Sequence, residues 1–310
     1  MASYLDKVMA VLVLPFLDAL ARDLVRPKDG PSVDFTQPAG EGALVPPDSV
    51  SWRIFKNPVA LFIGGVAAVI LELADPAVRT GVWHHSSFRQ DPVHRLRRTG
   101  LAAMITVYGG ESEARAMIAN VVRVHEKIAG RTPAGEPYRA NDVALLTWVQ
   151  ATAGFGFAQA YHRYVHALGR KELDRLCEEG LVAARLYGAA EAPTSHAALE
   201  RLFDSKRDRL EASPIVFEFL TIMRGAPVFP FVLRPLQGLL IRAAIDLVPD
   251  WVRSRLGLTA VFGLRPWQRP LARLAGALAD RVLIRSSPAV QSCLRLGLPA
   301  DYLYRRSGKK

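Results

Sequence analysis

The stretch NPVALFIGGVAAVIL, residues 57–71, contains no charged side chain. It is about fifteen residues long, which is shorter than the roughly twenty apolar residues that a transmembrane helix needs. We therefore predict a buried helix from Asn57 to about Leu73. Gly64 and Gly65 lie in its middle, and a residue without Cβ lets a neighbouring helix or a flat ligand approach the backbone closely.

The sequence on both sides of this helix favours further helices. Ala, Leu, Arg and Val dominate it, and Ala, Leu and Arg lose little free energy on entering a helix. The alternation of apolar and polar residues that is typical of strands is almost absent, and no dinucleotide-binding or P-loop motif occurs. The pattern predicts an all-α protein, a single multi-helix globular bundle of globin-like complexity.

We divide the chain into four parts: an N-terminal helix and extended arm (1–56), a core (57–190), C-terminal helices that complete the same domain (191–302), and a disordered basic tail (303–310). The first helix is expected over about residues 3–25. Residues 131–142, RTPAGEPYRAND, are expected to form a loop, with Ser112 capping the helix before it and Asp142 capping the helix after it.

The chain has a formal net charge of +11 and a pI of about 10.0. Such an excess can attract nucleic acid, an anionic membrane surface or an acidic substrate. No basic strip interleaved with aromatic residues and no known nucleic-acid-binding signature is present, so we predict no nucleic-acid partner and favour solvated arginine faces. Peripheral contact with a membrane stays open, as does the oligomeric state.

The cysteines and the N-terminal sequence bear on the cellular compartment. Cys177 and Cys293 match no metal or redox spacing, so a disulfide framework is not expected and a reducing compartment is favoured. The apolar run Val8–Leu17 is short, is broken by Pro15 and lacks a basic leader, so we do not interpret it as a signal peptide. We expect a cytoplasmic protein, with the membrane periphery as the other option.

The segment HHSSFRQDPVHRLRRTG, residues 84–100, holds several candidate site residues. Arg95 and Thr99 are four apart and share a helix face, and Arg98 lies beside an apolar stripe. A guanidinium in that position can anchor a carboxylate, a propionate or a phosphate. It can equally form an internal ion pair or extend its head to solvent, and spacing alone leaves these alternatives open.

Three histidines are candidate metal ligands, one by its helix face and two by their spacing. His125 projects from a largely apolar helix face, which is the setting that a proximal haem ligand needs. A single histidine on such a face is also typical of a hydrogen-bonded core residue. His162 and His166 are four apart, a spacing that can place two imidazoles on one metal ion, but no further metal motif accompanies them.

Two carboxylates, Glu72 and Asp75, follow the uncharged stretch. A carboxylate close to buried surface has its pKa raised by desolvation, which suits a general base near neutral pH. Each residue can instead have a local role, Glu72 at the end of one helix and Asp75 as the cap of the next. No Ser–His–Asp or Cys–His arrangement is readable at fixed spacing.

Several of these segments occur together in one known family. The runs LELADPAVRTGVWHHSSFRQDPVHRLRRT (71–99) and RVHEKIAGRTPAGEPYRANDVALLTWVQATAGFGFAQAYHRYV (123–165) resemble motifs of the MpaB / rubber oxygenase (latex-clearing protein) family, in the same order and with similar gaps. The resemblance covers roughly the central third of the chain. It implies that the core of 57–190 is an oxygenase-like catalytic domain with a buried haem pocket.

The resemblance also implies roles for individual residues. His125 falls at the position of the histidine that holds b-type haem, so it would be the iron ligand. Arg95, Arg98 and Thr99 would complete the cofactor site, and Arg95 and Thr99 would also belong to the catalytic site. The resemblance does not align a catalytic carboxylate, so Glu72 is the candidate from its place after the uncharged stretch alone. Arg98 falls where a lysine can bind iron in relatives, and a guanidinium is a poor iron ligand because it stays protonated.

We therefore predict a haem-b-dependent oxygenase that acts with dioxygen on a lipophilic substrate, with an unsaturated carbon chain as one option. A non-catalytic haem- or lipid-binding protein on the same scaffold is the first alternative. A non-haem metal enzyme that uses His162 and His166 is the second. The family pattern often has histidine where this chain has Asp75 and Gln150, so the chemistry here can differ from that of relatives.

Overall fold

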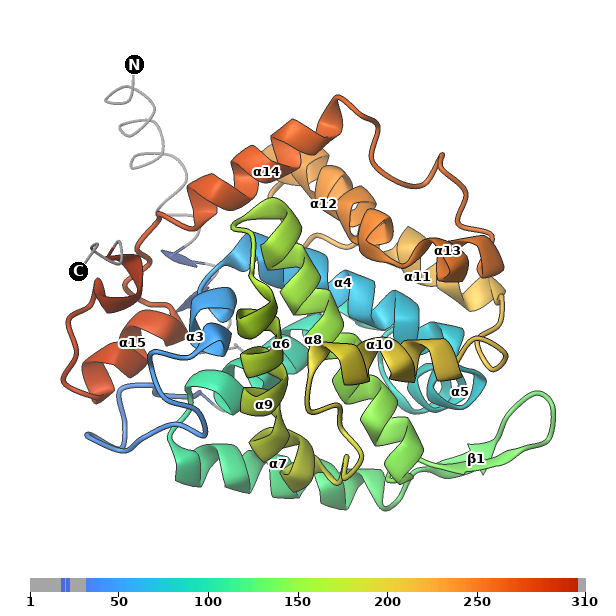
Figure 1. Ribbon diagram of the computed structural model, residues 1–310, viewed down its shortest axis with the longest axis horizontal. Helices are drawn as coiled ribbons and strands as arrows, with labels where there is room; N and C mark the ends of the chain where they lie inside the picture. Colours follow the sequence, from blue (N-terminus) through green and yellow to red (C-terminus); the bar gives the residue numbers. More distant parts are fainter. Residues whose placement is uncertain (1–17, 20, 23–31, 306–310) are drawn as a thin grey trace.

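The computed structural model describes residues 18, 19, 21, 22 and 32–305, and almost all regular structure within these ranges is helical (Figure 1). The prediction of a helical fold is therefore confirmed. Most of the expected N-terminal helix, and residues 306–310 of the expected tail, lie outside the described residues. The elements in chain order are α3 (Val50–Phe55), α4 (Pro58–Ala74), α5 (Pro76–His85), α6 (Pro92–Tyr108), α7 (Glu111–His125), β1 (Ala129–Arg131), β2 (Pro137–Arg139), α8 (Val143–Tyr164), α9 (Arg170–Tyr187), α10 (His196–Ser205), α11 (Pro214–Gly225), η2 (Phe231–Leu233), α12 (Arg234–Leu247), α13 (Asp250–Arg255), α14 (Gln268–Ala279), α15 (Pro288–Arg295) and η3 (Tyr302–Tyr304).

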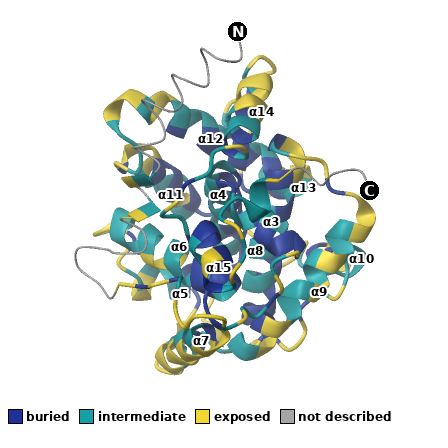
Figure 2. Ribbon diagram, turned by 90° about the vertical axis from the view of Figure 1, so that its left-hand side faces the viewer, coloured by how far each residue is buried: buried dark blue, intermediate teal, exposed yellow. Residues whose placement is uncertain are grey.

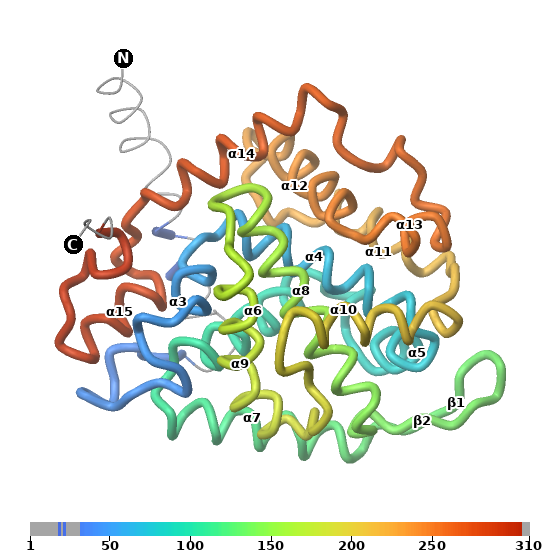
Figure 3. The backbone as a smooth tube through the Cα atoms, viewed as in Figure 1, coloured from blue at the N-terminus to red at the C-terminus, as the bar shows by residue number. Residues whose placement is uncertain are grey.

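Helix α4 is the central helix of the fold, as the uncharged stretch predicts. Asn57 begins it, because the side-chain Oδ1 accepts hydrogen bonds from the backbone N–H groups of Val59 and Ala60 at 3.1 and 3.0 Å. The main neighbour of α4 is α8, and α12, α5 and α14 pack around it (Figure 3). This position among other helices explains why the stretch before Glu72 carries no charge.

Helices α4 and α8 touch at two glycines. A Cβ on Gly64 would lie 2.8 Å from the carbonyl oxygen of Gly156, and a Cβ on Gly156 would meet the carbonyl oxygen of Gly64 more closely still. Both contacts are with backbone atoms, which cannot swing aside, so each position needs a residue without a side chain. Of the two options that the sequence left open for this glycine pair, a neighbouring helix is the one that Gly64 contacts.

The chain turns sharply where α4 ends, with a bend of 110° between α4 and α5. Asp75 forms this turn and caps α5, as predicted, because its Oδ1 accepts hydrogen bonds from Ala77 and Val78 N–H at 3.0 and 3.3 Å. The carboxylate is fully buried, and its Oδ2 lies 3.4 Å from Lys206 Nζ and 3.3 Å from Arg209 Nε. One side chain therefore fixes both the bend and the end of α10.

We expect Asp75→Ala to lower the free energy of unfolding by about 2 kcal/mol, because it removes the cap and leaves two cations beside the emptied site. Denaturant unfolding followed by circular dichroism measures the change. The matched control is Asp204→Ala, which removes an exposed carboxylate paired with Arg207 at 2.9 Å and should cost less than about 0.5 kcal/mol. Equal losses in the two variants would contradict the role given to Asp75.

None of the described helices is by itself long and apolar enough to cross a bilayer. Helices α4 and α5 meet the criteria of length and composition only as a pair, and the 110° bend separates them. Within the fold, ten of the 17 residues of α4 are buried.

Side chains fill two adjoining apolar cores. The larger core lies around α4, α8, α11 and α12. The smaller core joins the arm of residues 33–45 to α3, α6 and α15. Arg295 closes it, because its buried guanidinium donates hydrogen bonds to the backbone carbonyls of Phe35 and Tyr108 at 3.0 and 2.7 Å. The C-terminal part of the chain thereby holds the arm against α6.

The segment 131–142 differs from the predicted loop, because β1 and β2 pair antiparallel and form a short hairpin. Tyr138 is buried, and its ring lies 3.4 Å from the position that a Cβ on Gly81 of α5 would take. Beyond the hairpin, the N–H of Ala140 donates to the carbonyl of Ile128 at 2.9 Å. The hairpin thus connects the end of α7 to α8 and packs against α5.

Two predicted helix caps also differ. Gly110, not Ser112, precedes α7, and the Ser112 N–H and hydroxyl donate to the Glu41 carboxylate at 2.8 and 2.9 Å. Asp142 does occupy the N-cap position of α8, but its carboxylate accepts a hydrogen bond from the Arg139 N–H at 2.8 Å and leaves the helix uncapped by a side chain. Ser112 is bonded to the distant Glu41, and Asp142 is bonded to Arg139 of the hairpin, so neither side chain is free to cap its helix.

Candidate functional site

Glu72 lies in the last turn of α4 and is partly buried. Burial raises the pKa of its carboxyl group to about 7, while the charge of Arg95 and a hydrogen-bonding contribution from Thr152 act in the opposite direction. Glu72 therefore meets one residue from α6 and one from α8. The desolvation that the sequence predicts for this carboxylate is confirmed, and a pKa near 7 suits a group that accepts and releases a proton at neutral pH.

Arg95 and Thr99 share one face of α6, as their spacing predicts. The Arg95 guanidinium donates a hydrogen bond to the Thr99 hydroxyl, which itself donates to the Arg95 carbonyl oxygen at 2.9 Å. Burial lowers the pKa of Arg95, and the Glu72 carboxylate opposes this shift. Arg98 is exposed, and its charge acts on Arg95 as a repulsion. Arg95 therefore lies near the Glu72 carboxylate and is hydrogen-bonded to Thr99. Arg98 forms no hydrogen bond or ion pair with Glu72 or Thr99.

His125 is the last residue of α7 and is partly buried. Burial lowers the pKa of its imidazole, and the positive charge of Arg95 adds to this effect. The ring is therefore neutral at pH 7, which is the form that binds a metal ion. Among the described residues, neither ring nitrogen has a hydrogen-bond or ion-pair partner. The alternative that His125 is a hydrogen-bonded core residue is therefore not what the structure shows.

Arg95 connects the site electrostatically, because its charge acts on both Glu72 and His125. We call these three residues the Glu72–Arg95–His125 site. Its members come from α4, α6 and α7, which are separate in sequence. Sequence reasoning missed Thr152, whose buried hydroxyl donates to the Val149 carbonyl at 2.9 Å and lies beside Glu72. Its signal was its place at the end of the motif TWVQAT in α8.

The single helix face on which His162 and His166 were expected to lie does not form. Helix α8 ends at Tyr164, so His162 and His166 do not share a helix face. The Nδ1 of His162 instead accepts a hydrogen bond from the Leu168 N–H at 3.0 Å. In the part of the chain that the structure describes, no group of three or more His, Cys, Asp or Glu residues could hold a metal ion.

The two positions that depart from the family motif lie in different surroundings. Asp75 is occupied by its helix cap and by Lys206 and Arg209, so it is committed to the fold. Gln150 faces α9, with its Nε2 atom 3.4 Å from the position of a Cβ on Gly180. Neither side chain has a described contact with the Glu72–Arg95–His125 site.

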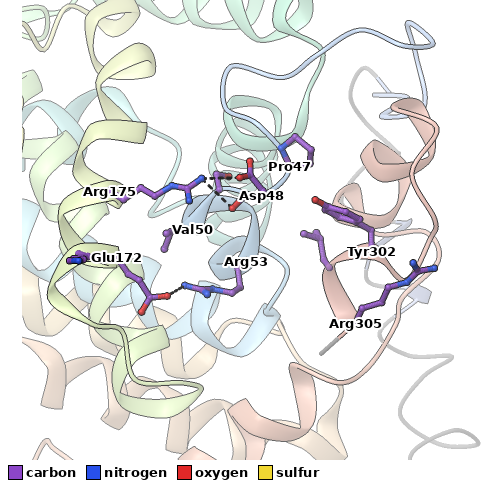
Figure 4. Close-up of a pocket in the computed structure, with 11 residues that line it drawn as sticks. Pro47, Asp48, Val50, Arg53, Glu172, Arg175, Tyr302 and Arg305 are labelled. Carbon is purple, nitrogen blue, oxygen red and sulfur yellow. Dashed lines mark hydrogen bonds and ion pairs between the residues drawn. The ribbon is translucent and has the colours of Figure 1, made fainter. Parts of the chain in front are cut away.

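Two cavities lie away from this site. The first, of about 450 Å³, lies between α3, α9 and η3, and Figure 4 shows Arg53 directed at Glu172 and Arg175 directed at Asp48 along it. The second, of about 430 Å³, lies beside the hairpin and the end of α10. Because Tyr302–Tyr304 form η3 at the first cavity, the residues that begin the predicted tail of 303–310 belong to the folded part.

The decisive comparison is with protein families. The family described as ER-bound oxygenase mpaB/B'/Rubber oxygenase, catalytic domain, matches residues 52–280. The chain belongs to this family. The family domain runs from α3 to the end of α14 and so extends well beyond the central third in which the motifs lie. No curated protein and no solved structure matches the chain.

Membership in the MpaB/rubber oxygenase family identifies an oxygenase domain. All members of the Glu72–Arg95–His125 site, together with Thr152, lie inside that domain. The C-terminal helices α10 to α14 lie inside it as well, although they carry little of the family's sequence signature. They supply part of the larger core against which α4 packs.

Proposed function

We propose that this member of the MpaB/rubber oxygenase family is a haem-b-dependent oxygenase that acts with dioxygen on a lipophilic substrate, an unsaturated carbon chain included. The observation that carries the proposal is His125, a partly buried neutral imidazole whose nitrogens have no partner among the described residues. The family identity supports the oxygenase class. The cofactor and the substrate class rest on the chemistry of the site.

The donor set of the site fits a haem group. An axial iron ligand needs a neutral imidazole with one ring nitrogen free for the metal, and His125 meets that requirement. The Arg95 guanidinium is a donor for a propionate carboxylate, and its bond to Thr99 restrains its position. Haem bound there would supply the binding and reduction of dioxygen. Arg98 is exposed and receives no role in this proposal.

Glu72 would act as a general base. With a pKa of about 7, its carboxylate is half ionised at neutral pH and can take a proton from the substrate. Arg95 favours the ionised form by its charge, and Thr152 favours it by hydrogen bonding. The proton then resides on a Glu72 oxygen, from which it can pass to solvent because the residue is only partly buried.

Apolar side chains accompany each polar residue of the site. Leu96 follows Arg95, Ile128 lies three residues after His125, and Val149 lies three before Thr152; all three pack against the larger core. An apolar setting of this kind would limit water at the reacting groups and favour a hydrocarbon. They support a lipophilic substrate over a polar one.

The absorption spectrum of the full chain, purified from cells supplied with a haem precursor, tests the proposal. We expect a Soret band with stoichiometric haem, and we expect His125→Ala to lose the band or shift it, because the axial ligand is gone. His166→Ala is the matched control, since His166 is exposed beyond the end of α8 and should leave the band unchanged. A protein without haem, or an unchanged band in His125→Ala, would rule the proposal out.

A non-catalytic haem-binding protein on the same scaffold would show the same Soret band, so oxygen consumption is needed to distinguish it from an oxygenase. Wild-type protein with haem should consume dioxygen in the presence of an unsaturated lipophilic compound. A normal Soret band without any oxygen consumption across such compounds would favour the binding protein instead.

A further inference from the structure

Helix α14 has two apolar faces, and the described residues cover only one of them. Ala272, Gly276 and Ala279 are buried, and the Gly276 carbonyl accepts a hydrogen bond from the Asn57 side chain at 3.0 Å. On the other side, Leu271 and Leu274 are 45% and 55% exposed, and Trp267, which precedes the helix, is 61% exposed. The spacing of four and three residues places all three on one stripe. The stripe has no partner among the described residues.

Further exposed apolar side chains belong to the elements beside α14. Phe231 and Val232 of η2 are 81% and 79% exposed, and Val261 in the loop before α14 is 78% exposed. Helix α12 packs against both η2 and α14, and Arg242 of α12 donates to the carbonyl of Val261 at 2.8 Å. These parts form one side of the molecule, where α14 and the loop lie at the outer edge (Figure 1), and Figure 2 shows exposed residues along α14. We call this region the α12–α14 surface: η2, α12, the loop before α14, and α14.

The α12–α14 surface lies in a part of the chain that is strongly basic. Residues 231–285 contain nine Arg and three Asp but neither Lys nor Glu. The carboxylate of Asp246 is 9% exposed and lies 3.6 to 3.7 Å from Arg163, Arg253 and Arg269. Asp250 pairs with Arg253, and Asp280 binds Lys56 at 3.2 Å, so each aspartate of this segment already has a cation beside it.

Several arginines at the surface carry no matching carboxylate. Arg234 lies over the ring of exposed Phe231, 5.7 Å from its centroid, and Arg265 is exposed next to Trp267. Arg242 donates only to backbone carbonyls. Burial lowers the pKa of Arg224, and the charge of Arg242 adds to this shift. Among the described residues, none of Arg234, Arg242 and Arg265 forms an ion pair with a carboxylate.

We propose that the α12–α14 surface docks the protein on an anionic phospholipid membrane, with its exposed apolar and aromatic side chains in the interface and its arginines on lipid phosphates. Trp and Phe favour the boundary between headgroups and acyl chains, and arginine binds phosphate through two or more N–H donors. Arginines without a paired carboxylate favour an anionic partner, and a lipid surface offers phosphates beside an apolar phase. The inference stands on this surface alone and does not depend on haem at His125.

Sedimentation with lipid vesicles tests the proposal on the full chain. We expect binding to vesicles of phosphatidylcholine mixed with phosphatidylserine, weak binding to phosphatidylcholine alone, and loss of binding at high salt, because screening removes the attraction. Leu274→Asp should weaken binding about tenfold or more, since it places a charge in the apolar stripe. Leu294→Asp on α15 is the matched control, because Leu294 is similarly exposed at 51% and lies outside the surface.

A second pair of variants separates the charge from the apolar contact. Arg234→Gln and Arg265→Gln should each weaken binding to the anionic vesicles about fivefold. Exposed Arg201 on α10 provides the control, and Arg201→Gln should leave binding unchanged. All variants keep the apolar run 8–17, so each differs from the wild type by its own substitution alone.

Three results would overturn the proposal. They are equal binding to neutral and anionic vesicles, equal effects of Leu274→Asp and Leu294→Asp, and a stable dimer in analytical ultracentrifugation that Leu274→Asp dissociates. The last result would show that a second copy of the chain covers the stripe.

Discussion

Glu72→Gln is expected to reduce oxygenase turnover by about 10²- to 10⁴-fold, the usual loss when a general base is removed. The wild-type rate should rise with pH through about 7, because the pKa of Glu72 is raised to about 7 by burial and only the ionised carboxylate accepts a proton. The variant should lose this dependence. Oxygen consumption by haem-loaded protein, measured between pH 5 and 9 with one lipophilic substrate, supplies both readouts.

The same substitution should affect stability in the opposite direction. The folded-state pKa of Glu72 lies above the ordinary value of 4.5 for a glutamate, so its contribution to stability is complete below pH 4.5 and is lost as the pH rises through about 7. Glutamine does not ionise, so Glu72→Gln should be more stable than wild type above pH 7, by up to about 3 kcal/mol and less where solvent reaches the carboxylate. A gain in stability together with a loss of turnover separates a catalytic carboxylate from a structural one.

Glu113 offers a matched control for the turnover measurement. It is partly buried on α7, and burial raises its pKa as well, but it does not belong to the Glu72–Arg95–His125 site. Glu113→Gln should leave turnover unchanged. If Glu72→Gln kept wild-type turnover and its pH dependence, Glu72 would not be the base.

Gly156→Ala is expected to destabilise the protein by about 3 kcal/mol or more, because the new methyl group must push α4 and α8 apart. A Cβ at this position would collide with the Gly64 carbonyl group and would also lie 3.3 Å from the Ala68 nitrogen. Both are backbone atoms within packed helices, so the strain cannot be relieved by a change of rotamer. Urea unfolding followed by circular dichroism measures the loss.

Gly154→Ala, two residues away on the same helix, is the control with the opposite sign. Nothing lies within 4 Å of a Cβ at Gly154, so alanine fits there without a clash. Because alanine is a better helix former than glycine, this variant should gain up to about 1 kcal/mol. Similar stabilities of the two variants would show that α4 and α8 can separate at no cost.

Much of the helical framework could be predicted because its signals are local. The uncharged run before Glu72 indicates burial on all sides, and Asp75-Pro76 carries the N-cap that begins α5. The pairing of Arg95 with Thr99 follows from their spacing on one helix. Each of these inferences needs only residues within one or two turns of each other.

The parts that could not be predicted depend on contacts between distant residues, or on strands too short to show an alternation of apolar and polar residues. The proximity of Glu72 to Arg95 joins separate helices, and no local pattern encodes it. Strands of three residues are too short to show alternation, so the hairpin was expected to be a loop. The spacing of His162 and His166 suggests one helix face, but α8 ends at Tyr164 and the Leu168 N–H turns back to donate to His162.

The contact between Gly64 and Gly156 also bears on how the chain folds as it is synthesised. The two residues are about ninety positions apart, so a ribosome releases α4 well before its main partner α8. During that interval the apolar surface of α4 has no helix to cover it. A nascent chain arrested between α5 and α8 should therefore recruit chaperones that bind exposed apolar segments, and it should release them once α8 has emerged.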